Sequence, residues 1–192
     1  MARPLSVTDE EIFDAAQNVM AQSGPAGFSI SEVARQVGLS RAAITFRFEG
    51  PDQLKRATFA RAIAFMEKEV ATWTIEEGSE GLLEIASRIG RMVGGRENFG
   101  SFMMRFSENL DDPAGIEMEQ QRGEVVRAAV GRAMPETCVT KAEAIDAFMA
   151  NISGALLSWR ASSGEDAEDF MVARTKVWLR LAGLMPEAKT GG

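Results

Sequence analysis

Histidine and tyrosine are absent from the 192-residue sequence, and cysteine occurs once, at Cys138. Without histidine, Ser-His and Cys-His nucleophile pairs and histidine-ligated metal sites are excluded. A lone cysteine cannot form an intramolecular disulfide, and we interpret Cys138 as a structural thiol. The sequence also lacks a glycine-rich phosphate loop and a paired acidic motif. It therefore predicts no enzymatic activity, no cofactor and no metal.

Long apolar runs are missing as well. No run approaches the roughly 18 residues that a membrane-spanning helix needs. The first residues, MARPLSVTDEE, lack the apolar core of a signal peptide. We therefore expect a cytoplasmic protein that makes no use of a membrane.

Positive charge is in short supply, because 28 acidic residues outnumber 21 basic ones and leave a net charge of −7. Phosphate binding depends on lysine and arginine, so this balance argues against a nucleic-acid partner. The distribution weakens that argument. Residues 1–60 carry six basic and seven acidic groups, or −1, which leaves −6 for the remainder. Four of the six basic groups fall within residues 41–56, so a local positive face is expected there.

What the sequence does contain is helical periodicity. Apolar residues recur at intervals of three and four in almost every segment, and no segment is a convincing strand. Thr8 followed by Glu11 is the capping-box pattern that begins a helix, and Gly38 is typical of a helix end. We predict an all-α fold of about nine helices, with a long helix over residues 52–72 and a polar tail after the last helix.

The stretch SRAAITFRFEGPDQL, residues 40–54, allows two interpretations. The alternation of Ile44, Phe46 and Phe48 with polar residues is typical of a half-buried strand. Ser40 as a cap, followed by Arg-Ala-Ala, favours a helix instead. An isolated strand leaves its backbone groups unpaired, so an all-α setting favours the helix.

As a helix, this stretch completes a helix-turn-helix. SEVARQV forms the first helix, Gly38-Leu39-Ser40 forms a tight turn, and a short second helix ends before Gly50-Pro51. Ala43, Ile44 and Phe48 are predicted to pack inward. Phe46 is predicted either to remain exposed or to pack against the next helix. In such a motif the second helix enters the major groove of DNA.

Residues 8–60 resemble the TetR family of transcriptional regulators. The resemblance rests on the lengths of the first four helices and on residues that stand where the family has their equivalents: Ala15, Ala16, Gly24, Val33, Ala34, Gly38, Leu39, Ser40, Ile44, Phe48 and Leu54. The remainder resembles the family only in helix count and length. The resemblance implies a helix-turn-helix domain over residues 1–50, with the motif at about 29–48, and a ligand-binding and dimerisation domain over residues 51–192.

Members of that family are homodimeric repressors that a small molecule releases from operator DNA. The resemblance therefore implies double-stranded operator DNA, an apolar small-molecule ligand and a second copy of the chain as partners. The residues that it implies at DNA are Ser29, Ser40, Arg41, Ala42, Thr45, Phe46, Arg47 and Lys55.

Two positions depart from the family pattern. Thr45 replaces a usual tyrosine, and Pro51 replaces a usual lysine that contacts phosphate. Lys55 or Arg56, about one turn later, is expected to take over that contact. We predict DNA binding that is weaker or less salt-sensitive than is usual for the family.

The C-terminal part is rich in methionine and aromatic residues, which indicate either helix-bundle core or an adaptable apolar pocket. The predicted pocket residues are Trp73, Phe102, Met103, Phe106, Met149 and Trp159, with Arg105, Glu108 and Asn109 as candidates to orient a ligand. The last two helices are apolar on wide faces and are predicted to form the dimer interface through Phe148, Ile152, Gly154, Ala155, Leu156, Val177 and Leu181.

Two rival functions stay open. One is a helix-turn-helix protein with weakened DNA binding that acts through a protein partner, which the acidic charge, Thr45 and Pro51 favour. The other is an all-α small-molecule carrier or enzyme that uses the apolar core.

Overall fold

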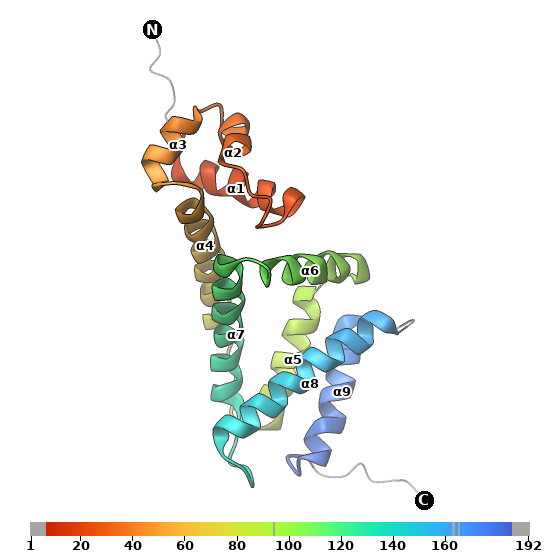
Figure 1. Ribbon diagram of the computed structural model, residues 1–192. Helices are drawn as coiled ribbons and strands as arrows, with labels where there is room; N and C mark the ends of the chain where they lie inside the picture. Colours follow the sequence, from red (N-terminus) through yellow and green to blue (C-terminus); the bar gives the residue numbers. More distant parts are fainter. Residues whose placement is uncertain (1–6, 94, 163, 165, 186–192) are drawn as a thin grey trace, which may run out of the picture. The chain divides into compact units, whose positions relative to one another are not determined.

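The computed structural model describes residues 7–93, 95–162, 164 and 166–185. In these residues it contains nine α-helices and no strand, which confirms the predicted all-α fold. The helices are α1 (Asp9–Ser23), α2 (Ile30–Val37), α3 (Arg41–Phe48), α4 (Pro51–Ala71), α5 (Ser79–Val93), α6 (Arg96–Asn109), α7 (Pro113–Ala133), α8 (Lys141–Ala161) and α9 (Ala167–Leu181) (Figure 1).

The chain divides into two compact units. Unit 1 contains residues 1–68 and 103–122, and unit 2 contains residues 69–102 and 123–192. The helices α4, α6 and α7 each contribute residues to both units. The domain boundary that we expect after residue 50 is a different kind of division and stays a prediction.

The first three helices of unit 1 begin and end where local chemistry directs. Thr8 caps α1 and forms the predicted capping box with Glu11. Gly38 ends α2 with φ +69°, a left-handed conformation that glycine adopts at little cost. The Ser40 hydroxyl then caps α3 by accepting a hydrogen bond from the Ala43 N–H at 3.1 Å.

The core of the helix-turn-helix is small and aliphatic. Ile12, Val19, Val33, Ile44 and Leu54 are fully buried and bring together α1, α2, α3 and the start of α4. The Phe13 and Phe48 rings close one side of this core in a T-shaped contact with centroids 5.5 Å apart. This packing fixes which face of α3 points away from the protein.

Unit 2 is built around α5, α8 and α9, with extensive packing of α9 against both other helices. Its core is more aromatic than that of unit 1, and Phe148 meets Trp178 with ring centroids 5.3 Å apart. Gly90 on α5 permits the close approach to α9, because a Cβ there would lie 2.5 Å from the Glu168 Cα. Along the described part of the chain, none of the helices combines the length and apolar character needed to cross a membrane.

Candidate nucleic-acid interface

The outward face of α3 presents the side chains predicted to meet DNA. Arg41, Ala42, Thr45 and Phe46 are all exposed, and Phe46 is 91% exposed. The interpretation in which Phe46 packs against the next helix is therefore wrong. Ile44 is buried and Phe48 half-buried as predicted, but Ala43 is exposed, contrary to its predicted inward position. Ala43 shares a face of α3 with the exposed Phe46 and Arg47, which lie three and four residues later.

The three arginines of the α2–α3 segment differ in what holds them. Arg35 forms a hydrogen-bonded ion pair with Glu32, and this pair lowers the pKa of the Glu32 carboxyl. Arg47 reaches back to the start of α1, where it pairs with Asp9 at 2.5 Å and donates to the Val7 carbonyl at 2.7 Å. Within the described helix-turn-helix, Arg41 is the arginine that no acidic side chain engages.

The two serines predicted at DNA occupy helix N-termini. Ser29 precedes α2 and is half-buried, and its side chain makes no capping hydrogen bond. The Ser40 hydroxyl is exposed but already caps α3. The first backbone N–H groups of a helix favour an anion, so the start of α3 suits a phosphate beside Arg41.

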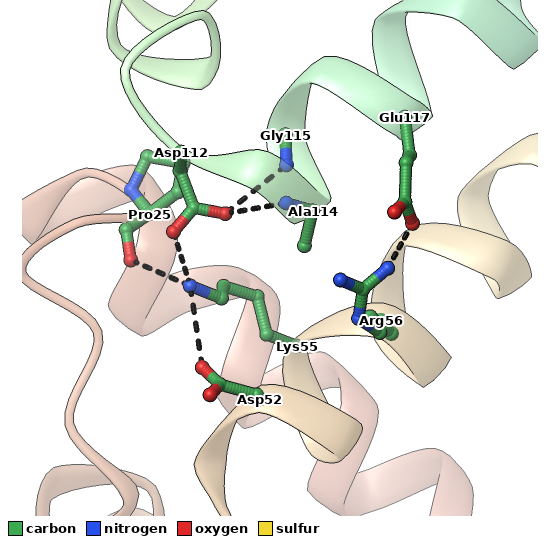
Figure 2. Close-up of polar contacts among 8 residues, drawn as sticks. All are labelled: Pro25, Asp52, Lys55, Arg56, Asp112, Ala114, Gly115 and Glu117. Carbon is green, nitrogen blue, oxygen red and sulfur yellow. Dashed lines mark hydrogen bonds and ion pairs between the residues drawn. The ribbon is translucent and has the colours of Figure 1, made fainter.

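Lys55 does not have the position that its predicted phosphate contact requires. It is only 6% exposed, and its Nζ lies 2.5 Å from Asp112 Oδ2, 3.5 Å from the Pro25 carbonyl and 3.7 Å from Asp52 Oδ1 (Figure 2). A lysine ammonium that is buried against carboxylate and carbonyl oxygens has no free face for phosphate. This arrangement argues against Lys55 as a DNA contact. Lys55 instead forms a buried ion pair that links two segments of unit 1.

Asp112 is the partner of Lys55 in this buried ion pair. Its Oδ1 caps α7 by accepting hydrogen bonds from the N–H groups of Ala114 at 3.0 Å and Gly115 at 3.1 Å, while its Oδ2 faces Lys55 (Figure 2). Burial by itself raises the pKa of Asp112. The hydrogen bonds from Lys55 and from the two backbone N–H groups, with the charge of Lys55, outweigh burial and lower the pKa below its usual range.

Unit 1 contains other ion pairs besides Lys55–Asp112. Arg56, the alternative to Lys55 as a phosphate contact, pairs with Glu117 on α7 (Figure 2). Arg61 on α4 pairs with Glu10 at 2.7 Å and Asp14 at 2.8 Å on α1. Most basic residues between positions 41 and 61 therefore form ion pairs with acidic residues of the same chain. The expected positive face is reduced largely to Arg41.

The predicted ligand residues fall into both units. In unit 2, Trp73 and Trp159 are buried, and Phe99 joins the Trp159 ring to the Phe102 ring with centroids 5.9 and 5.8 Å away. Met149, also in unit 2, is half-buried. Phe99 was not among the predicted pocket residues, although the spacing of the phenylalanines in FGSFMMRF indicates that it shares a helix with Phe102.

In unit 1, Met103 and Phe106 are half-buried, and the Arg122 guanidinium lies 5.7 Å from the Phe106 ring centroid. Of the polar residues predicted to orient a ligand, Asn109 is buried and donates to Glu119 at 2.7 Å, whereas Arg105 and Glu108 are exposed. The assignment of these residues to one pocket stays a prediction.

The residues predicted at a dimer interface divide by exposure. Phe148, Ile152 and Ala155 are buried inside unit 2, and their exposed fractions are 6% or less. They belong to the core of their own unit, which argues against them as interface residues. Leu156 is half-buried, while Gly154, Val177 and Leu181 are exposed and free to meet a partner.

Cys138 is exposed rather than part of the core. Among the described residues, no three histidine, cysteine or acidic side chains gather in a way that could hold a metal ion.

The comparisons agree with this geometry. Residues 12–58 match the family model described as bacterial regulatory proteins, tetR family. A comparison with curated protein sequences gives no significant match.

Solved structures resemble the whole chain. A TetR-family member from Streptomyces coelicolor A3 is 23% identical over 93% of this chain and 98% of its own, with a TM-score of 0.66. The multidrug binding protein EbrR, solved with malachite green, has the same identity and coverage and a TM-score of 0.65. The regulator FadR from Bacillus subtilis, solved with stearoyl-CoA, is 15% identical over 93% of this chain and 100% of its own, with a TM-score of 0.60.

These identities are low enough that the solved structures establish the fold alone, while the matched segment covers the helix-turn-helix and the start of α4. The chain therefore carries the N-terminal domain of the TetR family of bacterial regulatory proteins and has the all-α fold of that family's regulators.

Proposed function

We propose that this protein is a ligand-responsive transcriptional repressor that binds palindromic operator DNA as a homodimer. The observation that carries the proposal is the outward face of α3, where Arg41, Thr45 and Phe46 stand exposed beside a helix N-terminus. Side chains that serve the fold are buried or paired, whereas these are neither. Their place on the second helix of a helix-turn-helix suits contact with base edges in the major groove.

Dimerisation is supported by the outer faces of the last two helices. Gly154 and Leu157 on α8 and Val177 and Leu181 on α9 are exposed, and Leu181 is 84% exposed. A Cβ added at Gly154 would meet nothing within 4 Å, so a helix of another copy has room to approach there. Two α8–α9 pairs related by a two-fold axis would bury these apolar residues.

The proposed ligand is a small, largely apolar molecule that binds in the helical C-terminal part. The aromatic cluster of Phe99, Phe102 and Trp159 in unit 2 supports this class, because binding sites combine apolar walls with few polar groups. The solved structures of EbrR and FadR hold malachite green and stearoyl-CoA respectively. These ligands are examples of apolar bodies with polar or charged parts, which is the class that we propose here.

We further propose that α4 and the turn before α7 carry the signal. The Lys55–Asp112 pair ties the first turns of α4 to that turn, and Lys55 also contacts the Pro25 carbonyl before α2. A ligand that shifts α6 or α7 would therefore move the support of the helix-turn-helix. By linkage, operator DNA must weaken ligand binding by the same factor as the ligand weakens DNA binding. Equal ligand affinity with and without operator would rule out this coupling.

The first test is selection of bound DNA from a random pool with the purified full-length protein at moderate salt. We expect an enriched palindrome with half-sites about one DNA turn, roughly 34–36 Å, apart. The matched control is the Arg41→Ala, Phe46→Ala double variant, which should fold and enrich nothing. A folded dimer that enriches no sequence would contradict the proposed function.

A protein partner in place of DNA is the second candidate function. It is favoured by the ion pairs that occupy Arg35, Arg47 and Arg56, which leave few cations for phosphate. Competition between the selected DNA and a captured protein for the α3 face would distinguish the two functions, since only one partner fits on that face at a time.

A further inference from the structure

Phe46 is the most exposed of the large apolar side chains that the structure describes. At 91% exposure its ring makes almost no contact with the protein, whereas Ile44 and Phe48 on the same helix pack inward. A single exposed apolar residue is ordinary on a protein surface. Its position in the middle of the outward face of α3, one turn after Ala42 and next to Thr45, gives it a specific meaning.

The neighbours of Phe46 leave the ring free to reach a groove floor. Ala42 and Thr45 are small and exposed, so the backbone of α3 can approach base edges closely around the ring. Arg47, the next residue, is drawn away to Asp9 and the Val7 carbonyl. The outward face of α3 thus offers one arginine, Arg41, and one large apolar group, Phe46, as its long side chains.

A phenyl ring has no hydrogen-bond donor or acceptor, so only one feature of the major groove suits it. Thymine carries a C5-methyl group there, and apolar side chains distinguish thymine by contact with this methyl group. Phosphate contacts require donors or charge, which the ring lacks.

We infer that Phe46 is a specificity-determining residue that reads the C5-methyl group of a thymine in each half-site. This inference rests on the proposed DNA-binding function and adds the base that one side chain recognises. The contact is made by each subunit, so a palindromic site contains the thymine twice.

The test replaces each thymine of the selected operator in turn by uracil, which lacks only the methyl group. We expect one thymine position, present once in each half-site, at which uracil weakens binding of the wild-type protein. The loss should be about fourfold per half-site, because that is the effect of burying one methyl group. Phe46→Ala should bind the thymine and uracil operators equally. Phe46→Leu keeps an apolar side chain and should retain part of the preference for thymine.

The variants should fold, because an exposed ring contributes little to stability, and thermal unfolding checks this. Phe65→Ala removes another exposed ring, on α4 and outside the residues predicted at DNA, so it is the matched control and should keep the uracil sensitivity of the wild-type protein. A wild-type protein that is insensitive to uracil at every position, or a Phe46→Ala variant with unchanged sensitivity, would overturn the inference while leaving DNA binding intact. Failure to select any DNA would instead overturn the proposed function, and the inference with it.

Discussion

Different kinds of interaction stabilise the interior of each of the two units of this protein. In unit 1, segments far apart in the sequence are joined by ions, as in Lys55–Asp112 and Arg61–Asp14. In unit 2, ion pairs between distant segments, such as Arg91–Glu168, are more exposed than Lys55–Asp112, and the buried contacts include rings, as in Phe99–Trp159 and Phe148–Trp178. Ionic ties depend on geometry and charge, whereas apolar packing depends on volume and area. The unit that carries the helix-turn-helix should therefore respond to single charge changes that unit 2 tolerates.

The exposed surfaces differ in the same way. On α3 the outward face combines Arg41 with polar Thr45 and the Phe46 ring, which suits a polyanion with apolar methyl groups. On α8 and α9 the exposed residues include Gly154, Val177 and Leu181, which suit another apolar helix. Under the proposed function, a few exposed residues decide which class of partner each of these surfaces meets.

The largest expected effect concerns the buried ion pair of unit 1. Asp112→Asn keeps a side chain able to cap α7 but removes the charge opposite Lys55. Asp52 remains 3.7 Å from Lys55, but losing the nearer partner of this buried charge should destabilise unit 1 by about 3 kcal/mol. Hydrogen exchange of the α1 and α3 amides at neutral pH measures this effect. Glu117→Gln removes the partner of Arg56 at a half-exposed site and should cost less than about 1 kcal/mol. Equal losses of stability in the two variants would mean that the buried and the half-exposed ion pair contribute alike.

Acid should weaken the same ion pair in a defined direction. The pKa of Asp112 is lower in the folded protein than in the unfolded chain, where it is about 3.9. The stability from its charge is therefore fully present above the unfolded pKa and is lost as pH falls through the folded pKa. We expect the difference between wild type and Asp112→Asn to be constant from about pH 6 to 5 and to shrink below about pH 4. A difference that persists at lower pH would contradict this account.

A charge on the exposed face of α9 tests the apolar surface of unit 2. Leu181→Glu should leave the fold intact, because Leu181 is 84% exposed, but it should convert the proposed dimer to a monomer. Loss of bivalent binding should lower operator affinity at least about a hundredfold. Sedimentation and DNA binding measure the two effects. Val139→Glu, at another exposed apolar position of unit 2, is the control and should remain a dimer that binds DNA.

Arg41 and Arg35, two exposed arginines of the helix-turn-helix, provide a matched pair. Arg41→Ala should lower operator affinity about five- to a hundredfold, the range for one specific base contact. Arg35→Ala should have little effect, because Arg35 is already paired with Glu32 on the surface. Binding titrations of the selected operator measure both variants. A larger loss for Arg35→Ala than for Arg41→Ala would mean that the ion pairs do not decide which arginines reach DNA.

The smallest expected effect is in the salt dependence of DNA binding. Because Arg35, Arg47, Lys55 and Arg56 are all paired with acidic residues of the same chain, few cations remain to displace counterions from DNA. We expect log affinity against log salt to have a slope between about −2 and −4 for the dimer. Arg41→Ala should make it shallower by about 1 per subunit if Arg41 also neutralises phosphate. A slope near −10 would show that the paired side chains are released on binding.

Local features of the fold were predictable from the sequence because their causes lie within a few residues. The capping box of Thr8 and Glu11, the end of α2 at Gly38 and the start of α4 at Pro51 each depend on neighbouring atoms. The helical interpretation of residues 41–48 was also correct, since an isolated strand had no partner in an all-α chain. The failure at Ala43 shows the limit, because the periodicity of an eight-residue helix does not tell how wide its buried face is.

The roles of individual side chains required tertiary contacts. Asp112 followed by Pro113 predicts a helix start, but nothing local indicates that Asp112 also faces Lys55, 57 residues away. Because of that contact, Lys55, which was expected to bind phosphate, is part of a buried ion pair. Likewise, the apolar faces of α8 and α9 were apparent from spacing, but only packing separated the buried Phe148 and Ile152 from the exposed Val177 and Leu181.

The sequence by itself determined that this chain is all-helical, that it carries a helix-turn-helix and that it resembles the TetR family, because caps, breakers and periodicity act over short distances. The tertiary structure alone decided which charges are available to a partner. A charge is consumed or left free by the group that meets it in space, and residues such as Asp9 and Arg47, or Lys55 and Asp112, meet only when the chain has folded.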